Sequence, residues 1–296
     1  MWQKNKPYIL IFPALVTIVG LFAGGFFEGF LQSIGLTSFM GVSRFSLYAY
    51  KKLLNTSEFW DAFLLTLRIA LIATGISAAI GMLVVFCLFW MQSEKKGSKA
   101  LLWQRFFQIP MLFPYLIAAY LIFLMCVQSG WISRIFFHLG LIKKMEDFPI
   151  LVHDSFGWGI IIAYVWKTAP FMVLMLYPAL MKVKFSWIEL GYVFGANRLK
   201  FFVEVVFPLL APVWKMTSFI VFSYTFLAFE IPFLLGVTYP KVLSVYAYQI
   251  YMNGDLIDRP MAMAVNVLII LCIAVLGGIC YILDSKREKE RGKWNG

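Results

Sequence analysis

Six long apolar stretches alternate with shorter polar segments along this chain of 296 residues. A helix needs about 20 apolar residues to cross the hydrocarbon core of a bilayer, and each stretch is long enough to do so. We place the spans at residues 8–30, 61–91, 106–128, 159–181, 208–235 and 260–283. The pattern therefore predicts an all-α, polytopic membrane protein with about six transmembrane helices.

The polar segments between the spans predict how the chain is organised. Residues 1–60 hold the first transmembrane helix and an outer segment, in which residues 45–54 are typical of a short amphipathic helix on the membrane surface. Residues 61–283 form the membrane core domain, and residues 284–296 form a basic tail. Pro110 and Pro114 interrupt the third span, so we expect that helix to be kinked.

Composition and charge support the membrane assignment and add a topology. The chain is 61% hydrophobic and 14% charged, whereas a soluble domain has about half apolar and about a quarter charged residues. The N-terminus, segments 93–105 and 182–207 and the tail carry 15 of the 26 Lys and Arg residues, and the other loops carry eight. This bias predicts that both termini and segment 182–207 face the cytoplasm. Cations placed beside apolar spans also argue against a nucleic-acid partner, despite the net charge of +11.

Segment 182–207 lacks a membrane span yet carries clear helix signals. Ser186 and Glu189 have the spacing of a capping box, which predicts a helix that begins at Ser186. Gly195 is the natural end of that helix, because glycine enters the left-handed region at little cost. Asn197 is then placed to cap a second short helix, and Pro208 lies where the fifth span should begin.

This segment resembles the EAA loop of binding-protein-dependent ABC importer permeases. That motif reads Glu-Ala-Ala, three residues, Gly, and later a Leu-Pro or Phe-Pro pair. Glu189, Gly195 and Ala196 take the corresponding places, and Phe207 with Pro208 forms the closing pair. The departures are Leu190 and Gly191 at the two Ala positions, and Phe194 where sugar permeases often carry Asp.

Two further segments resemble the same superfamily. Residues 165–171 contain a Trp followed by a Pro-Phe pair, as these permeases often do before the EAA loop. Residues 229–236, in which Glu230 precedes Ile231 and Pro232, are closer to the polyamine-type branch than to the sugar branch.

The resemblance implies a type I ABC importer permease in a bacterial inner membrane. Its partners would be a second permease subunit, more often a different chain than an identical one, two ATPase subunits, an extracytoplasmic solute-binding protein and membrane lipid. ATP would bind to the ATPase subunits and no cofactor to this chain, which contains no Gly-x-x-x-x-Gly-Lys-[Ser/Thr] motif. The resemblance makes segment 182–207 the coupling loop, with candidate residues Ser186, Glu189, Gly191, Gly195, Ala196, Asn197 and Pro208. The alternative is that Glu189 and Gly195 only cap and end their own helix.

Charged residues inside the spans predict the solute pathway. A charge facing lipid is costly, so Lys167 and Glu230 should face the interior, and Pro232 should loosen the helix beside the carboxylate. The two charges either contact the solute or form a structural ion pair between the fourth and fifth spans. The solute, polyamine-like or a sugar, is not named by the sequence.

Two other classes of function are weighed against this reading. A secondary transporter that works alone would use Arg68, Lys167 and Glu230 as an ion relay, although Arg68 can also reach the membrane interface. A membrane-embedded enzyme would need a catalytic constellation, and the sequence shows neither a nucleophile elbow nor a metal-ligand spacing. We therefore expect no enzymatic activity and no metal site on this chain.

Overall fold

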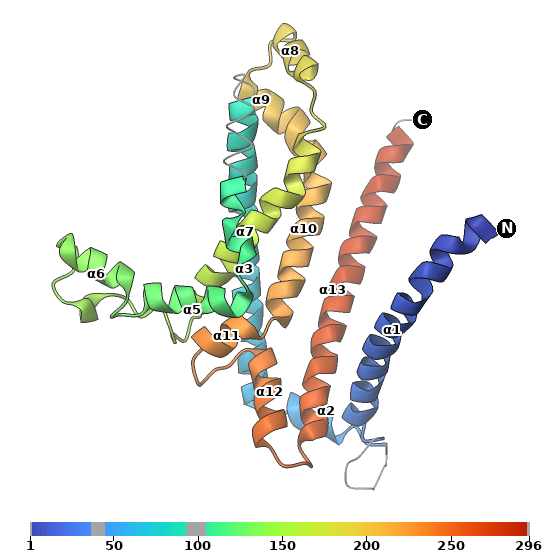
Figure 1. The fold of residues 1–296 in the computed structure, drawn as a ribbon, viewed down its shortest axis with the longest axis vertical. Coiled ribbons are helices and arrows are strands. Elements are labelled where there is room, and N and C mark those ends of the chain that lie inside the picture. Colours follow the sequence, from blue (N-terminus) through green and yellow to red (C-terminus); the bar gives the residue numbers. More distant parts are fainter. Residues whose placement is uncertain (1, 37–44, 93–104, 295–296) are drawn as a thin grey trace. The chain divides into compact units, whose positions relative to one another are not determined.

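The computed structural model describes residues 2–36, 45–92 and 105–294, and within these ranges the chain is helical and contains no strand (Figure 1). Six helical segments are long and apolar enough to cross a membrane, at residues 10–33, 57–91, 115–138, 158–180, 198–227 and 259–282. The all-α prediction with six spans is confirmed. The elements are α1 (Trp2–Ser33), α2 (Tyr48–Leu54), α3 (Ser57–Gln92), η1 (Ile109–Leu112), α5 (Tyr115–Cys126), α6 (Trp131–His138), η2 (Met145–Asp147), α7 (Trp158–Leu180), α8 (Phe185–Val193), α9 (Arg198–Phe201), η3 (Phe202–Val206), α10 (Phe207–Leu227), α11 (Glu230–Leu235), α12 (Leu243–Asn253) and α13 (Arg259–Trp294).

The chain divides into two compact units, one of residues 1–60 with 243–296 and one of residues 61–242. In the first unit α13 packs against α1, α2 and α12. The Ser33 hydroxyl lies 2.7 Å from that of Tyr50, and the Lys52 ammonium donates to Asp258 at 3.1 Å. That hydrogen bond raises the pKa of Lys52. These two units do not test the predicted division of the chain into a first helix with an outer segment, a membrane core and a tail, which stays a prediction.

Helix α2 confirms the short helix expected in the outer segment, although it begins only at Tyr48. Its side chains Ala49 and Leu53 are buried, whereas Lys51 and Lys52 are exposed, as expected of an amphipathic helix. At the other end of the chain, α13 runs on from the sixth span to Trp294. As far as Trp294, the basic tail is therefore a helical continuation of that span.

The second unit is built around α7, which packs against α10, α5, α11 and η1. Helix α3 also approaches α7 closely, because a Cβ atom at Gly81 would lie 2.5 Å from the Met172 Cβ. The hydroxyls of Ser77 and Thr168 meet at 2.7 Å between the same two helices. A glycine and two small polar side chains thus set the distance between α3 and α7.

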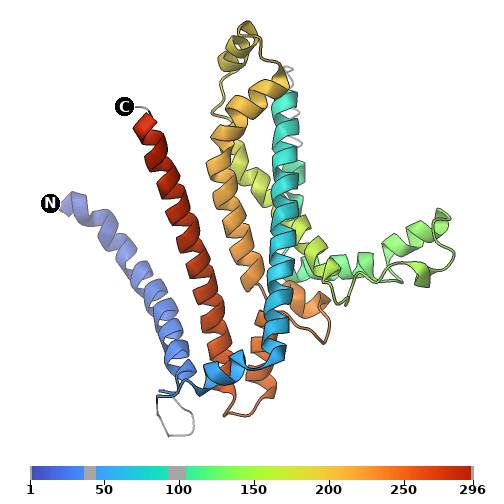
Figure 2. The ribbon, with the colours of Figure 1, turned by 180° about the vertical axis from the view of Figure 1, so that it is seen from behind.

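The third span is broken rather than kinked, so that prediction is wrong. A short 3-10 turn, η1, is followed by an extended Phe113 and by Pro114, and only then by α5. The residue before a proline is pushed out of the α region, which explains the break. Helices α5 and α6 consequently run across the direction of α3 and α10 (Figures 1 and 2).

The fifth span also ends earlier than predicted. Helix α10 stops at Leu227, Ala228 is extended with ψ 144°, and α11 begins at Glu230. The break therefore precedes the carboxylate instead of following it. Pro232 lies in the first turn of α11, where a helix needs no N–H donor, and so it does not cause the break.

Candidate coupling hairpin and polar cavity

Helix α8 opens the hairpin that corresponds to segment 182–207. It begins at Phe185 with Lys184 in the N-cap position, and no side chain caps it. The predicted capping box of Ser186 and Glu189 is therefore wrong. The first helical residue is Phe185, one residue before Ser186, and the Trp187 N–H donates to the carbonyl of the N-cap residue Lys184 at 3.1 Å. Ser186 and Glu189 consequently lie within α8 with exposed side chains.

The turn after α8 follows the predicted glycine stop. Gly195 has φ +77°, and its N–H donates to the Tyr192 carbonyl at 3.0 Å. The Ala196 N–H donates to the Gly191 carbonyl at 2.9 Å. These two bonds form a Schellman motif, which needs a left-handed residue at its centre. The prediction that Gly195 ends the helix through a left-handed backbone conformation is confirmed.

For the second half of the hairpin, the predicted start is confirmed and the predicted end is wrong. The Asn197 side chain accepts a hydrogen bond from the Lys200 N–H at 2.8 Å, so Asn197 is the predicted cap. The helix then continues from α9 through the π-helical η3 into α10, without ending as a separate short helix. The Phe207 N–H reaches back to the Phe202 carbonyl. Pro208 lies in the first turn of α10 and supplies no N–H, and a π-type turn is a common response to such a gap.

Gly191 explains one departure from the EAA pattern. A Cβ atom at this position would lie 2.7 Å from Cδ2 of Phe201, so only glycine fits without movement of that ring. Leu190, the other departure, is 53% exposed. The close approach of α8 to α9 is therefore built on a residue smaller than the usual alanine.

An aromatic cluster fixes the hairpin to the end of α3. Phe201 stacks on Phe89 with ring centroids 6.2 Å apart, and Phe202 meets Phe86 edge-on at 4.8 Å. Buried aliphatic side chains from α3, α7, α8, η3 and α10 complete this core: Val85, Leu88, Val173, Leu176, Leu180, Ile188, Val206 and Leu210. Because this packing is dense, the hairpin and the ends of three membrane spans should move as one body.

Arg198 adds a second connection from the hairpin to α3. Its Nε donates to the Tyr192 hydroxyl at 2.9 Å, and its guanidinium lies 5.3 Å from the centroid of the Trp90 ring.

The outer face of α8 is instead left uncovered. Val193 and Phe194 are each 83% exposed, next to the exposed Trp187 and Leu190. An apolar patch of this kind commonly marks a surface that another protein covers.

Lys167 has partners that the sequence did not indicate. Its ammonium is buried and donates to the Pro110 carbonyl at 2.9 Å and to the Phe113 carbonyl at 2.5 Å. It also lies 4.6 Å from the centroid of the Tyr115 ring. Lys167 thus closes the gap that the broken third span leaves in the main-chain hydrogen bonds. No ion pair joins it to Glu230, both of which the structure describes, so the predicted structural ion pair does not form.

Glu230 begins α11 with an exposed side chain, and Pro232 is buried. The carboxylate lies near enough to Tyr115, Tyr164 and Tyr224 to interact electrostatically with them. The rings of Tyr115 and Tyr224 pack with centroids 4.7 Å apart. Tyr164 is fully buried, and its hydroxyl has no hydrogen-bond partner among the residues that the structure describes. Three tyrosines are therefore within electrostatic reach of a carboxylate at the junction of the fifth span and α11.

Next to this junction lies a polar cavity of about 230 Å³. Tyr115, Lys167, Thr168 and Tyr224 give it hydroxyl and ammonium groups on an otherwise apolar wall. Its remaining lining residues are Met111, Phe171, Ile220 and Val221. Lys167 thus lines the cavity, and Glu230 lies beside its tyrosines.

Arg68 resembles Lys167 in what it binds. Its guanidinium donates to the Ser155 carbonyl at 2.9 Å and to the Phe156 carbonyl at 3.0 Å, and it lies 4.3 Å from the Phe156 ring centroid. It therefore holds the loop that leads into α7. In this structure both Arg68 and Lys167 are engaged by main-chain carbonyls, which does not favour the ion relay considered above.

Comparison with known proteins decides the class of this molecule. The family described as binding-protein-dependent transport system inner membrane component matches residues 89–289, which include the hairpin and the cavity. The chain belongs to this family. It is the permease component of a binding-protein-dependent ABC importer, and the family is one of transport subunits and not of enzymes.

Relatives of the permease carry names for several kinds of solute. It is 22% identical over 290 residues to the probable starch degradation products transport system permease protein AmyD of Thermoanaerobacterium thermosulfurigenes, covering 96% of this chain and 95% of that one. It is 29% identical over 221 residues to the sn-glycerol-3-phosphate transport system permease protein UgpA of Escherichia coli strain 536, covering 70% and 68%. A bacterial ABC transporter for import of the acidic polysaccharide alginate contains a chain of the same fold, with TM-score 0.73, 18% identity and coverage of 96% and 98%.

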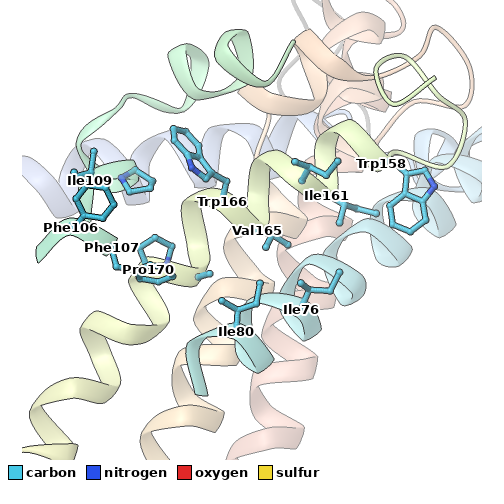
Figure 3. A pocket seen from close by; sticks show the side chains of 13 residues that line it. Ile76, Ile80, Phe106, Phe107, Ile109, Trp158, Ile161, Val165, Trp166 and Pro170 are labelled. Carbon is cyan, nitrogen blue, oxygen red and sulfur yellow. The ribbon is translucent and has the colours of Figure 1, made fainter. Parts of the chain in front are cut away.

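The permease also has a larger cavity, of about 620 Å³, whose chemistry is different (Figure 3). Side chains from α3, α7 and residues 106–110 surround it, among them Ile80, Val165 and Trp166. All of its lining residues are apolar in type. A polar solute finds few hydrogen-bond partners there, so the smaller cavity is the better candidate for its path.

Sequence reasoning missed the tyrosines and Thr168 of the permease. Tyr164, Lys167 and Thr168 follow the spacing i, i+3, i+4, which places them on one face of α7. That spacing was a usable signal. Nothing in the sequence placed Tyr115 or Tyr224 beside them, because those residues come from other spans.

Proposed function

We propose that this permease forms part of a solute pathway and that its hairpin, residues 182–207, docks on a separate ATPase. The observation that carries the proposal is the hairpin itself, which exposes an apolar patch on one side and is packed into α3, α7 and α10 on the other. When ATP draws the ATPase subunits together, the hairpin transmits their movement to the spans. ATP must bind the outward-open state of the importer more tightly than the alternative state, because only a difference in affinity can shift the equilibrium and so change access to the cavity.

The partners follow from the same proposal. They are a second permease subunit, two ATPase subunits that bind ATP, and an extracytoplasmic solute-binding protein. The solved alginate transporter was captured with a periplasmic protein that holds an alginate pentasaccharide, which supports a binding protein here. The charge bias of the loops supports a bacterial inner membrane location with both termini and the hairpin in the cytoplasm.

For the solute we propose a carbohydrate. AmyD is named for starch degradation products and the solved transporter for alginate. The polar cavity offers the tyrosine rings and hydroxyls that suit a polyhydroxylated ring. A polyamine would bring its positive charges towards the ammonium of Lys167, and no relative reported above is named for a polyamine. The pathway residues are then Tyr115, Tyr224 and Glu230. Lys167 lines the cavity wall, and Pro232 follows Glu230 in the first turn of α11.

The experiment compares two glycine variants in the reconstituted importer. Gly195→Val forces a β-branched residue into the left-handed turn of the hairpin, where φ is +77°. Gly140→Val is the matched control, because Gly140 has φ +70° and equally open surroundings after α6. Both variants carry the same kind of backbone strain, and only the first alters the hairpin.

We expect Gly195→Val to abolish ATP-driven uptake while the ATPase subunits still hydrolyse ATP. Gly140→Val should retain uptake close to that of the unaltered permease. Full uptake by Gly195→Val, or equal loss in both variants, would refute the coupling role. Uptake by the permease alone, without any ATPase, would refute the importer proposal for this chain.

A further inference from the structure

A hollow of about 300 Å³ lies between α8 with the turn that follows it and residues 201–205 of the hairpin. Its lining is apolar except for one carboxylate, that of Glu204. The lining residues are Trp187, Leu190, Gly191, Phe194, Ala196, Phe201, Glu204 and Val205. Two exposed aromatic side chains, Trp187 and Phe194, belong to this wall.

Glu204 is unusual in its surroundings. It lies in the π-helical η3, its side chain is exposed, and it makes no ion pair with any residue that the structure describes. The other exposed charges of the hairpin are mostly positive, including Lys182, Lys184 and Lys200. Among the residues that the structure describes, this carboxylate at the edge of an apolar hollow therefore has no ion-pair partner.

We infer that this hollow receives an arginine side chain of the ATPase subunit, with its guanidinium paired to Glu204. A long cationic side chain can bury its alkyl stem on apolar walls while its charge stays at a polar edge. The planar guanidinium also stacks on aromatic faces such as that of Trp187, and it binds a carboxylate through two N–H groups. The inference rests on the proposed function, because it names the chemistry of the surface that the hairpin meets.

Other occupants fit less well. An apolar side chain would fill the hollow but would leave the Glu204 carboxylate partly removed from water and without a partner. An acidic side chain would be repelled by Glu204. A lysine would also pair with the carboxylate, but its compact, strongly hydrated ammonium lacks the planar fork that stacks on the aromatic wall, so arginine is the better fit.

The first test measures binding of the purified ATPase subunit to the full-length permease in lipid nanodiscs. Glu204→Gln keeps the shape of the side chain and removes its charge. Glu146→Gln is the matched control, since Glu146 is an exposed glutamate in η2, far along the chain from the hairpin. We expect Glu204→Gln to weaken binding about tenfold, as the loss of a charge-assisted hydrogen bond does, and the control to bind normally.

The second test is charge reversal. Glu204→Arg should bind poorly, and one Arg→Glu variant of the ATPase, found by changing its exposed arginines in turn, should restore binding. Normal binding by Glu204→Gln, or restoration by none of the reversed arginines, would overturn the inference.

The same preparation separates this inference from the proposed function. If Gly195→Val uncouples transport but the Glu204 variants bind normally, the coupling role stands and the arginine assignment fails. If the ATPase does not bind the unaltered permease, the proposed function fails and the arginine assignment fails with it.

Discussion

Replacing Lys167 with methionine tests the role that the structure gives this residue. Lys167 is 4% exposed, and its ammonium donates hydrogen bonds to the carbonyls of Pro110 and Phe113. A third carbonyl, that of Met111, lies 3.4 Å away and adds little. Methionine has a similar length and flexibility but no donor, so Lys167→Met leaves both carbonyls unpaired in a buried site.

The magnitude follows from those two bonds. A hydrogen bond to a charged group contributes about 1.5–3 kcal/mol, so two of them contribute about 3–6 kcal/mol. Part of this loss is offset, because methionine is cheaper to bury than an ammonium. We therefore expect a net destabilisation of about 3 kcal/mol, which lowers the melting temperature of a domain of this size by about 6–12 °C.

The assay is thermal unfolding of the purified permease in nanodiscs, together with uptake measured well below the melting temperature. Lys143→Met is the control, because Lys143 is exposed in the loop after α6. A fall in stability in Lys167→Met but not in the control supports the structural role. An unchanged melting temperature with lost uptake would refute it and make Lys167 a direct contact of the solute.

Two further predictions concern packing and capping. Gly81→Ala should destabilise the permease by about 1–3 kcal/mol in thermal unfolding, because its methyl group would overlap Met172. Gly75→Ala is the control on the same helix, and it should be neutral or slightly stabilising because the space around it is open. Equal effects of the two variants would contradict the close approach of α3 and α7. Asn197→Ala should lower the free energy of local unfolding at the start of α9 by about 1 kcal/mol, and so speed hydrogen exchange of the Lys200 amide. Unchanged exchange would show that the Asn197 cap does not stabilise the helix.

Features that depend on neighbouring residues in the chain were predictable. The six spans follow from length and hydropathy, since few other structures can satisfy the backbone in lipid. The end of α8 at Gly195 and the cap at Asn197 follow from conformational freedom and side-chain chemistry that act within three residues. The EAA spacing, read from the same residues, identified the family that the comparison confirms.

Predictions from the sequence were wrong where two local signals competed. Ser186 and Glu189 have the spacing of a capping box, yet α8 begins one residue earlier and leaves both exposed. Proline in a span indicates either a kink or a break, and the choice depends on whether another helix can satisfy the freed carbonyls. At Pro114 the chain breaks, and the donor that makes the break tolerable is Lys167 on α7.

The sequence by itself thus determined how many times this chain can cross a membrane, where its hairpin turns, and which residues are too polar to face lipid. Only the tertiary structure decided what those polar residues bind. Lys167 meets carbonyls some 55 residues away, and Tyr115 and Tyr224 come from different spans to share one cavity. The reason is physical: hydropathy and turn chemistry act between neighbours in the chain, whereas a buried charge is satisfied by whichever groups packing brings within about 3 Å.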